Sequence, residues 1–171
     1  MTMKEPVSFL YSSNKKCGSK LISWATRDHG QRTSETPSHF SILLYDWIVI
    51  ESTLAFGLEP KLYSKFKDHN NIIAQFAPKD GKRDAALIAK KTADKNRNAN
   101  YDFAGALFLG WHAIMRFHFD KPLPKVNRFE SAKDFFCNEI YADLYGGDVS
   151  MKHPNWLMKD MMKDDRLIRL K

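Results

Sequence analysis

Two observations on this chain of 171 residues predict an α+β fold. Short runs rich in β-branched and apolar residues, typical of strands, lie in the first half, at 39–44, 47–52 and 71–76. Longer segments with apolar residues at helical spacing lie in the second half, at 80–95, 103–117 and 131–145. We therefore expect one domain over 1–171, with an antiparallel sheet packed against helices.

The remaining segments predict shorter or peripheral structure. Residues 1–16 are polar and are expected to be peripheral, and 18–26 reads as a short helix or turn. Turn-forming residues predict loops at 27–37 and 120–128. Gly57 and Pro60 are expected to end the hairpin unit, and 62–67 is a short amphipathic piece. The basic, Met-rich segment 151–171 is also expected to be peripheral, with one further helix.

Composition limits the classes of protein to which the chain can belong. Hydrophobic residues make up 43%, which indicates a folded protein, and no run approaches the roughly 20 apolar residues of a membrane span. The N-terminus does not resemble a signal peptide, so the predicted location is the cytoplasm unless another route exports the protein. The formal net charge is +7, but the basic residues are spread among acids and no nucleic-acid motif accompanies them. Nucleic acid is therefore not an expected partner.

The hairpin at 39–52 carries the first candidate catalytic residues, His39 and Glu51. A three-residue loop, 44–46, would make these two side chains cross-strand neighbours, because directly opposed residues share a face. A two-residue loop would instead place Ser52 opposite His39 and turn Glu51 to the other face. The sequence leaves both registers open.

The second candidate feature is a thiol, Cys137, in the predicted C-terminal-half helix. A thiol close to the N-terminus of a helix and to a histidine can act as a nucleophile. A helix that begins at Ser131 would leave Cys137 in its second turn, where the helix dipole has little effect, so a start nearer Phe135 suits this chemistry better. Alone, a cysteine on an apolar helix is more often a core residue. Cys17 is expected to be an unpaired thiol, and no metal-binding motif or cofactor is predicted.

Five short motifs, taken in order, resemble a known family. They are 18–26 (GSKLISWAT), 37–43 (PSHFSIL), 49–52 (VIES, with Gly57 beyond), 101–105 (YDFAG) and 136–140 (FCNEI). This set is similar to the circularly permuted NlpC-type papain-like enzymes, the YiiX-like group, over about residues 17–147. The order of histidine, acid and cysteine is the permuted one.

The resemblance implies a permuted papain-like fold and roles for particular residues. Cys137 would be the nucleophile, His39 the general base and Glu51 the acid that orients the histidine. Tyr101 and Asp102 would help to shape the substrate cleft; the alternative role for Asp102 is the N-cap of the helix that follows. The chain has Asn138 where the family has serine, and this departure affects substrate and oxyanion contacts.

The implied activity is that of a thiol hydrolase or acyltransferase acting on an amide or ester bond, with peptidoglycan-type peptides or isopeptides as the leading substrates. Lipid acyl groups are also implied. Members of this superfamily occur among bacteriophage and prophage proteins. The alternative is thus a non-catalytic structural or binding protein on the same fold, such as a component of a phage particle, with a virion-associated location.

Overall fold

The computed structural model describes residues 7–14, 16–53, 57–79, 87, 91, 100–101, 103–122, 124, 134–135 and 152–171. The strands are β1 (Val7–Asn14), β2 (His39–Leu44), β3 (Ile48–Thr53), β4 (Gly57–Leu62), β5 (Asn70–Pro78), β6 (Asn100–Tyr101), β7 (Asp134–Phe135) and β8 (Leu167–Arg169). The helices are α1 (Cys17–Thr26), the 3-10 turn η1 (Thr33–Glu35), α2 (Tyr63–His69), α4 (Phe103–Phe119) and α6 (Pro154–Lys163).

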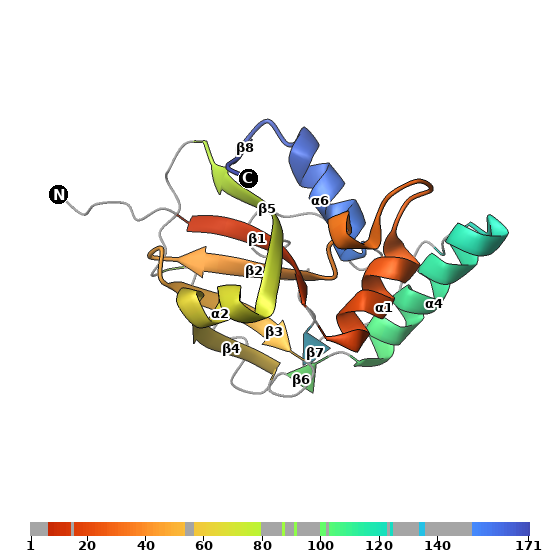
Figure 1. The fold of residues 1–171 in the computed structure, drawn as a ribbon, viewed down its shortest axis with the longest axis horizontal. Helices are drawn as coiled ribbons and strands as arrows, with labels where there is room; N and C mark the ends of the chain where they lie inside the picture. The colour runs from red at the N-terminus through yellow and green to blue at the C-terminus, as the bar shows by residue number, and fades with distance from the viewer. Residues whose placement is uncertain are drawn as a thin grey trace.

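A six-stranded sheet with the order β4-β3-β2-β1-β5-β8 forms the centre of the described structure (Figure 1). Each pair of neighbouring strands in it is antiparallel. Helices α1 and α4 lie side by side at one end of the sheet, and α6 lies near the edge formed by β8. The predicted α+β class with an antiparallel sheet and helices is therefore confirmed.

Alternation along the strands separates two faces of this sheet, and the face that carries His39 also carries α2. Leu43 and Val49 on this face pack with Ile72 and with Phe66 of α2. The opposite face is also apolar, and its buried side chains include Phe40, Ile42, Leu44, Ile50, Ala74 and Phe76. Apolar residues on both faces explain why β2 reads as a nearly continuous hydrophobic run.

The two terminal segments contribute more than predicted. Residues 7–14, within the segment expected to be peripheral, form the strand β1 between β2 and β5. The apolar and β-branched run Val7 to Tyr11, interrupted by Ser8, is the strand signal that was missed. In the C-terminal segment, β8 pairs with β5, and Leu157 and Met161 of α6 are buried. This segment is thus part of the core.

Two predicted boundaries also change, and a third cannot be compared over most of its length. Gly57 and Pro60 do not end the hairpin unit but lie in β4, where proline is tolerated because β4 is the end strand of the described sheet. Residues 134–135 of the helix predicted over 131–145 are the strand β7, which pairs in parallel with β6. Leu87 and Lys91 are helical, but the rest of the helix predicted over 80–95 lies outside the described residues.

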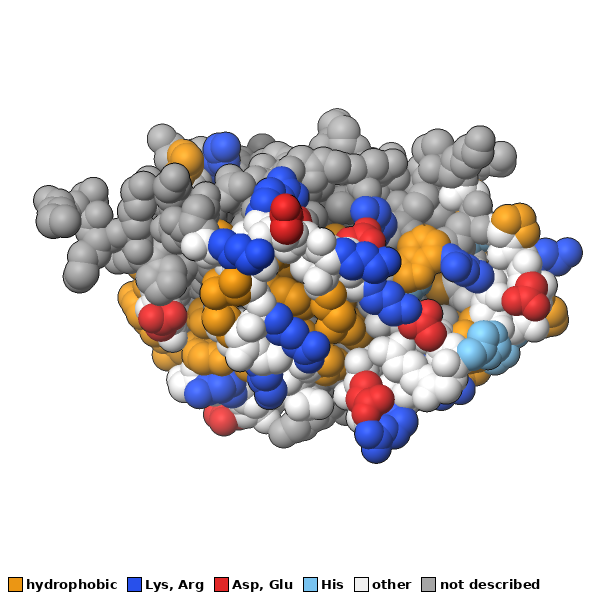
Figure 2. Space-filling view, turned by 90° about the horizontal axis from the view of Figure 1, so that it is seen from above, with side chains coloured by type: hydrophobic (Ala, Val, Ile, Leu, Met, Phe, Trp, Pro, Cys, Tyr) orange, Lys and Arg blue, Asp and Glu red, His pale blue; other side chains and the backbone are white. Residues whose placement is uncertain are grey.

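Charge is dispersed on the surface. On the face seen in Figure 2, Lys and Arg side chains are scattered, with Asp and Glu side chains between them. Among the described residues, no helix is long and apolar enough to cross a membrane.

Candidate functional site

His39 is the first residue of β2, and its position is determined by bonds to β1. The backbone N–H of Ser38 donates to the Ser12 carbonyl at 3.3 Å, and the Ser38 hydroxyl donates to the same oxygen at 3.4 Å. His39 itself opposes Ser12 in the β1–β2 ladder. Its side chain is 17% exposed, so the ring is largely enclosed but still reaches solvent.

Glu51 lies beside His39, although the hairpin register differs from both predicted alternatives. The loop comprises Tyr45 to Trp47, so that Leu44 opposes Ile48 and Ser41 opposes Glu51. Tyr45 and Asp46 have positive φ, and Trp47, which was assigned to the strand, belongs to the turn and is exposed.

In this register Glu51 shares a face with His39 as a diagonal neighbour rather than a directly opposed one. A diagonal neighbour on an antiparallel pair is within reach of a long side chain. The Nε2 atom of His39 lies 3.2 Å from Oε2 of Glu51, which is an ion-pair distance. The predicted contact is therefore present, but the predicted loop was wrong by one residue.

The neighbouring strand β4 supplies two further charged residues that the sequence analysis did not identify. Lys61 forms an ion pair with the second carboxylate oxygen of Glu51, and it also binds Glu59 at 2.7 Å. Glu59 lies directly opposite Glu51 in the β3–β4 ladder, where two carboxylates alone would repel each other. Lys61 offsets that repulsion and completes a chain of ionisable groups, His39–Glu51–Lys61–Glu59.

These contacts determine the ionisation of Glu51. Burial of the carboxyl group opposes its ionisation, but the hydrogen bonds and positive charge of His39 and Lys61 outweigh this effect and lower the pKa of Glu51 to about 2. Lys61 is affected in the opposite direction: burial lowers its pKa, but bonding to Glu51 and Glu59 raises it above the ordinary value overall. Glu51 is thus a carboxylate throughout the physiological pH range.

A buried carboxylate against one nitrogen of an imidazole has a defined chemical use. It holds the ring in one orientation and stabilises the protonated ring, so the other nitrogen can accept and return a proton. The alternation of Glu59 and Lys61 along β4 was the available signal for the extended network. It was missed because Pro60, which lies between them, was read as the end of the unit.

The other predicted site residues fall mainly outside the described residues. The structure does not describe Cys137, Asn138 or Asp102. For Tyr101 it describes the backbone, which is part of β6. β6 contacts β4, and Figure 1 places β6 and β7 beside the point where β3 ends and β4 begins. Tyr101 pairs with Phe135, which precedes Cys137 by two residues in the sequence.

Cys17 is a free and exposed thiol at the first residue of α1. Within the part of the chain that the structure describes, no group of three or more His, Cys, Asp or Glu side chains is arranged to hold a metal ion.

Comparison with protein-family models gives no match, and comparisons with curated proteins and with solved structures give no significant match.

Proposed function

We propose that this chain is a thiol hydrolase or acyltransferase with a permuted papain-like fold, in which Cys137, His39 and Glu51 act together. The observation that supports this proposal most strongly is the 3.2 Å contact between Nε2 of His39 and Oε2 of the buried Glu51. The position of β7 supports the proposal further. β7 pairs with β6 near the end of β3, the strand that carries Glu51, and it ends two residues before Cys137 in the sequence. The resemblance of the five sequence motifs supplies the role of the thiol.

The proposed reaction has two steps, and His39 takes part in both. In the first, Nδ1 of His39 accepts the proton of the Cys137 thiol, and the sulfur attacks the carbonyl carbon of an amide or ester. The bond to the leaving amine or alcohol breaks, His39 returns the proton to that group, and an acyl thioester remains on Cys137. Backbone amides near Cys137 would stabilise the oxyanion that forms in this step.

In the second step a water molecule, or an acceptor amine or alcohol, attacks the thioester. His39 removes the proton from the attacking group, the bond between carbon and sulfur breaks, and the thiol is restored. Glu51 remains charged and holds the imidazole ring while that ring becomes positive. The substrate class that we favour is a peptidoglycan-type peptide or isopeptide, with Tyr101, Asp102 and Asn138 close to the substrate.

The chain contains an internal control for a test of this proposal, because it has two cysteines. We would treat the protein with iodoacetamide at about pH 5.5, where ordinary thiols react slowly, and follow each cysteine by peptide mass spectrometry. Cys137 should react much faster than the exposed Cys17, and His39→Ala should slow the reaction of Cys137 without changing that of Cys17. Equal rates at the two thiols in the unmodified chain would contradict the proposal.

Turnover provides the second test. Hydrolysis of peptidoglycan stem peptides should be lost in Cys137→Ala and in His39→Ala, while both variants keep the circular dichroism spectrum of the wild type. A rate that is unchanged in either variant would exclude the mechanism, and no hydrolysis by the wild type would favour a structural role.

A further inference from the structure

A second site lies away from His39, in a pocket of about 220 Å³ between the end of α1, the segment that follows it, α4 and the start of α6. Its lining includes Arg27, Asp28, Arg116, Phe117, His153 and Trp156. Pockets for drug-sized ligands usually measure about 300–1,000 Å³, so this one suits a smaller compound.

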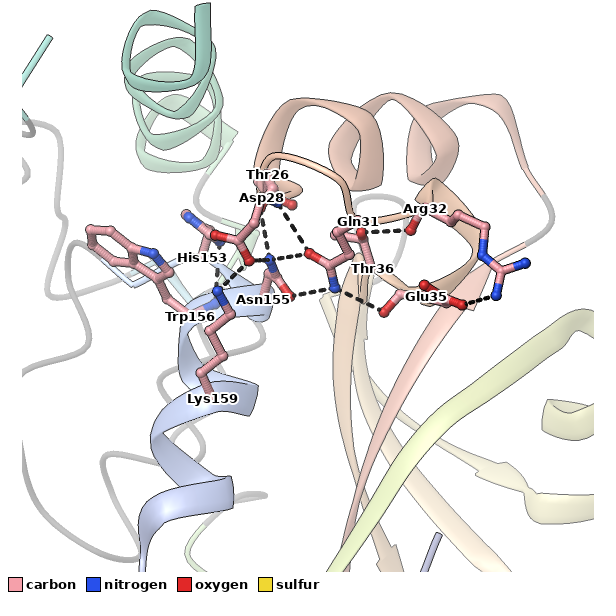
Figure 3. Close-up of polar contacts among 10 residues, drawn as sticks. All are labelled: Thr26, Asp28, Gln31, Arg32, Glu35, Thr36, His153, Asn155, Trp156 and Lys159. Carbon is pink, nitrogen blue, oxygen red and sulfur yellow. Dashed lines mark hydrogen bonds and ion pairs between the residues drawn. The ribbon is translucent and has the colours of Figure 1, made fainter. Parts of the chain in front are cut away.

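The wall of this pocket is held together by Asn155, which is fully buried. Its side-chain amide donates to the Thr26 carbonyl at 3.0 Å, to Oε1 of Gln31 at 3.0 Å and to Oδ2 of Asp28 at 3.3 Å. Figure 3 shows that these bonds join the first turn of α6 to the segment after α1. The two segments are far apart in the sequence, so these bonds hold two walls of the pocket in place relative to each other.

The lining of the pocket carries two arginines and two aspartates, and positive charge exceeds negative charge when Lys159, which pairs with one of these aspartates, is included. Asp28 is paired with Lys159 of α6, so its charge is offset within the wall, and Asp120 is the other lining carboxylate. The positively charged groups in the lining are the guanidinium groups of Arg27 and Arg116. Neither arginine forms an ion pair with a carboxylate in the part of the chain that the structure describes.

Aromatic rings orient both guanidinium groups. The guanidinium carbon of Arg116 lies 4.2 Å from the centre of the Trp156 ring, and that of Arg27 lies 5.4 Å from the centre of the Phe117 ring. Nη1 of Arg27 also donates to the Thr33 hydroxyl at 3.3 Å, and stacking of this kind leaves the remaining N–H groups at the edges of the guanidinium planes available for a ligand. Each ring also stacks with a histidine: the ring centres of Phe117 and His29 lie 4.6 Å apart, and those of Trp156 and His153 lie 5.1 Å apart.

His153 adds a donor at the base of this site. Its Nδ1 atom accepts a hydrogen bond from the backbone N–H of Trp156 at 3.4 Å, which caps α6. Burial lowers the pKa of His153 to about 4; the opposing effect of Asp28 is smaller, and the charges of Arg116 and Lys159 lower the pKa further. The ring is therefore neutral at pH 7, and its proton resides on Nε2, which can donate to a ligand.

We propose that this pocket binds a small organic oxyanion, a carboxylate or phosphate carried on a planar apolar body, through Arg27 and Arg116. The oxygens receive N–H groups from the two guanidinium forks, which suit planar oxyanions. The apolar body lies against Phe117 and Trp156. This site is separate from the proposed reaction at His39 and does not depend on it.

The test uses the full chain labelled with ¹⁵N and three aromatic probes of similar size: benzoate, phenyl phosphate and the neutral benzamide. The indole N–H signal of Trp156 should shift and saturate with one or both anions, with a dissociation constant on the order of 1 mM for so small a ligand. Trp47, which is exposed on the β2–β3 turn, is the internal control and should not shift. Benzoate and phenyl phosphate distinguish a carboxylate ligand from a phosphate ligand.

Three variants complete the test. Arg27→Gln and Arg116→Gln should each weaken binding about tenfold or more, as expected for the loss of a charge-assisted pair of hydrogen bonds. Arg169→Gln, on strand β8, removes the same charge from a residue that does not line the pocket and should leave the affinity within about twofold. The proposal is overturned if neither anion saturates by about 20 mM, if benzamide binds as well as benzoate, or if all three variants behave alike.

Discussion

Replacement of Glu51 by glutamine should remove a pH-dependent part of the stability of this fold. The substitution keeps the shape of the side chain but removes the charge that pairs with His39 and Lys61. The magnitude follows from the pKa of Glu51, which is lowered from an ordinary value of 4.5 to about 2. Because 1.36 kcal/mol corresponds to one pH unit, this difference contributes about 3 kcal/mol to the folded state.

The sign of the pH dependence is determined by the direction of this change. A carboxyl group whose pKa is lowered on folding stabilises the protein fully at pH values above the unfolded pKa, here 4.5, and loses that contribution as the pH falls towards 2. The Glu51 side chain is only 7% exposed, so solvent screening reduces its contribution to the free energy of unfolding only slightly. Wild type should therefore exceed Glu51→Gln by about 3 kcal/mol at pH 6 and by less than about 1 kcal/mol at pH 2.

Urea unfolding followed by circular dichroism at pH 6, 4, 3 and 2 would measure this difference. Glu35→Gln is the matched control, because Glu35 is 49% exposed and its pair with Arg32 lies on the surface. Its loss should change the free energy of unfolding by less than about 0.5 kcal/mol. A difference between wild type and Glu51→Gln that stays constant from pH 6 to pH 2 would refute the reasoning.

Three further changes test the packing and the charge network, each by urea unfolding at pH 7. Lys61→Met should lower the free energy of unfolding by about 1 kcal/mol, because two opposed carboxylates lose their shared partner, whereas Lys65→Met on the exposed side of α2 should have little effect. Asn155→Ala should cost about 2–3 kcal/mol, since it leaves buried hydrogen-bonding groups without partners. Phe66→Ala should cost about 3–5 kcal/mol because the side chain is 1% exposed, and Leu62→Ala, at a position 46% exposed, should cost less than about 1 kcal/mol.

The sequence was sufficient to predict a hairpin that carries His39 and Glu51, but not the register that decides whether the two side chains share a face. Alternation places 39, 41 and 43 on one face in any register, but it does not relate that face to Glu51 on the next strand. The pairing depends on where the turn ends, and Trp47 reads as a strand residue by composition while its backbone belongs to the turn. Tyr45 and Asp46 both have positive φ, but the sequence Tyr-Asp is not one of the glycine-containing pairs that predict such a turn.

Long-range order was harder to predict than local pattern. Nothing in residues 7–14 indicates that they pair with β2 on one side and β5 on the other, because that choice depends on contacts between distant segments. Likewise, the bonds from Asn155 to the segment after α1 join residues more than a hundred positions apart. Neither arrangement is indicated by a local pattern in the sequence.

β4, the end strand of the sheet that the described residues form, has a second consequence, for association between molecules. A strand at the end of a sheet offers unpaired N–H and C=O groups to any other extended chain, and such strands promote aggregation. Pro60 removes one N–H from this strand, and the charged side chains of Glu59 and Lys61 would have to be dehydrated by an incoming strand. The residues that hold Glu51 in place are thus also ones that discourage a foreign strand from docking beside it.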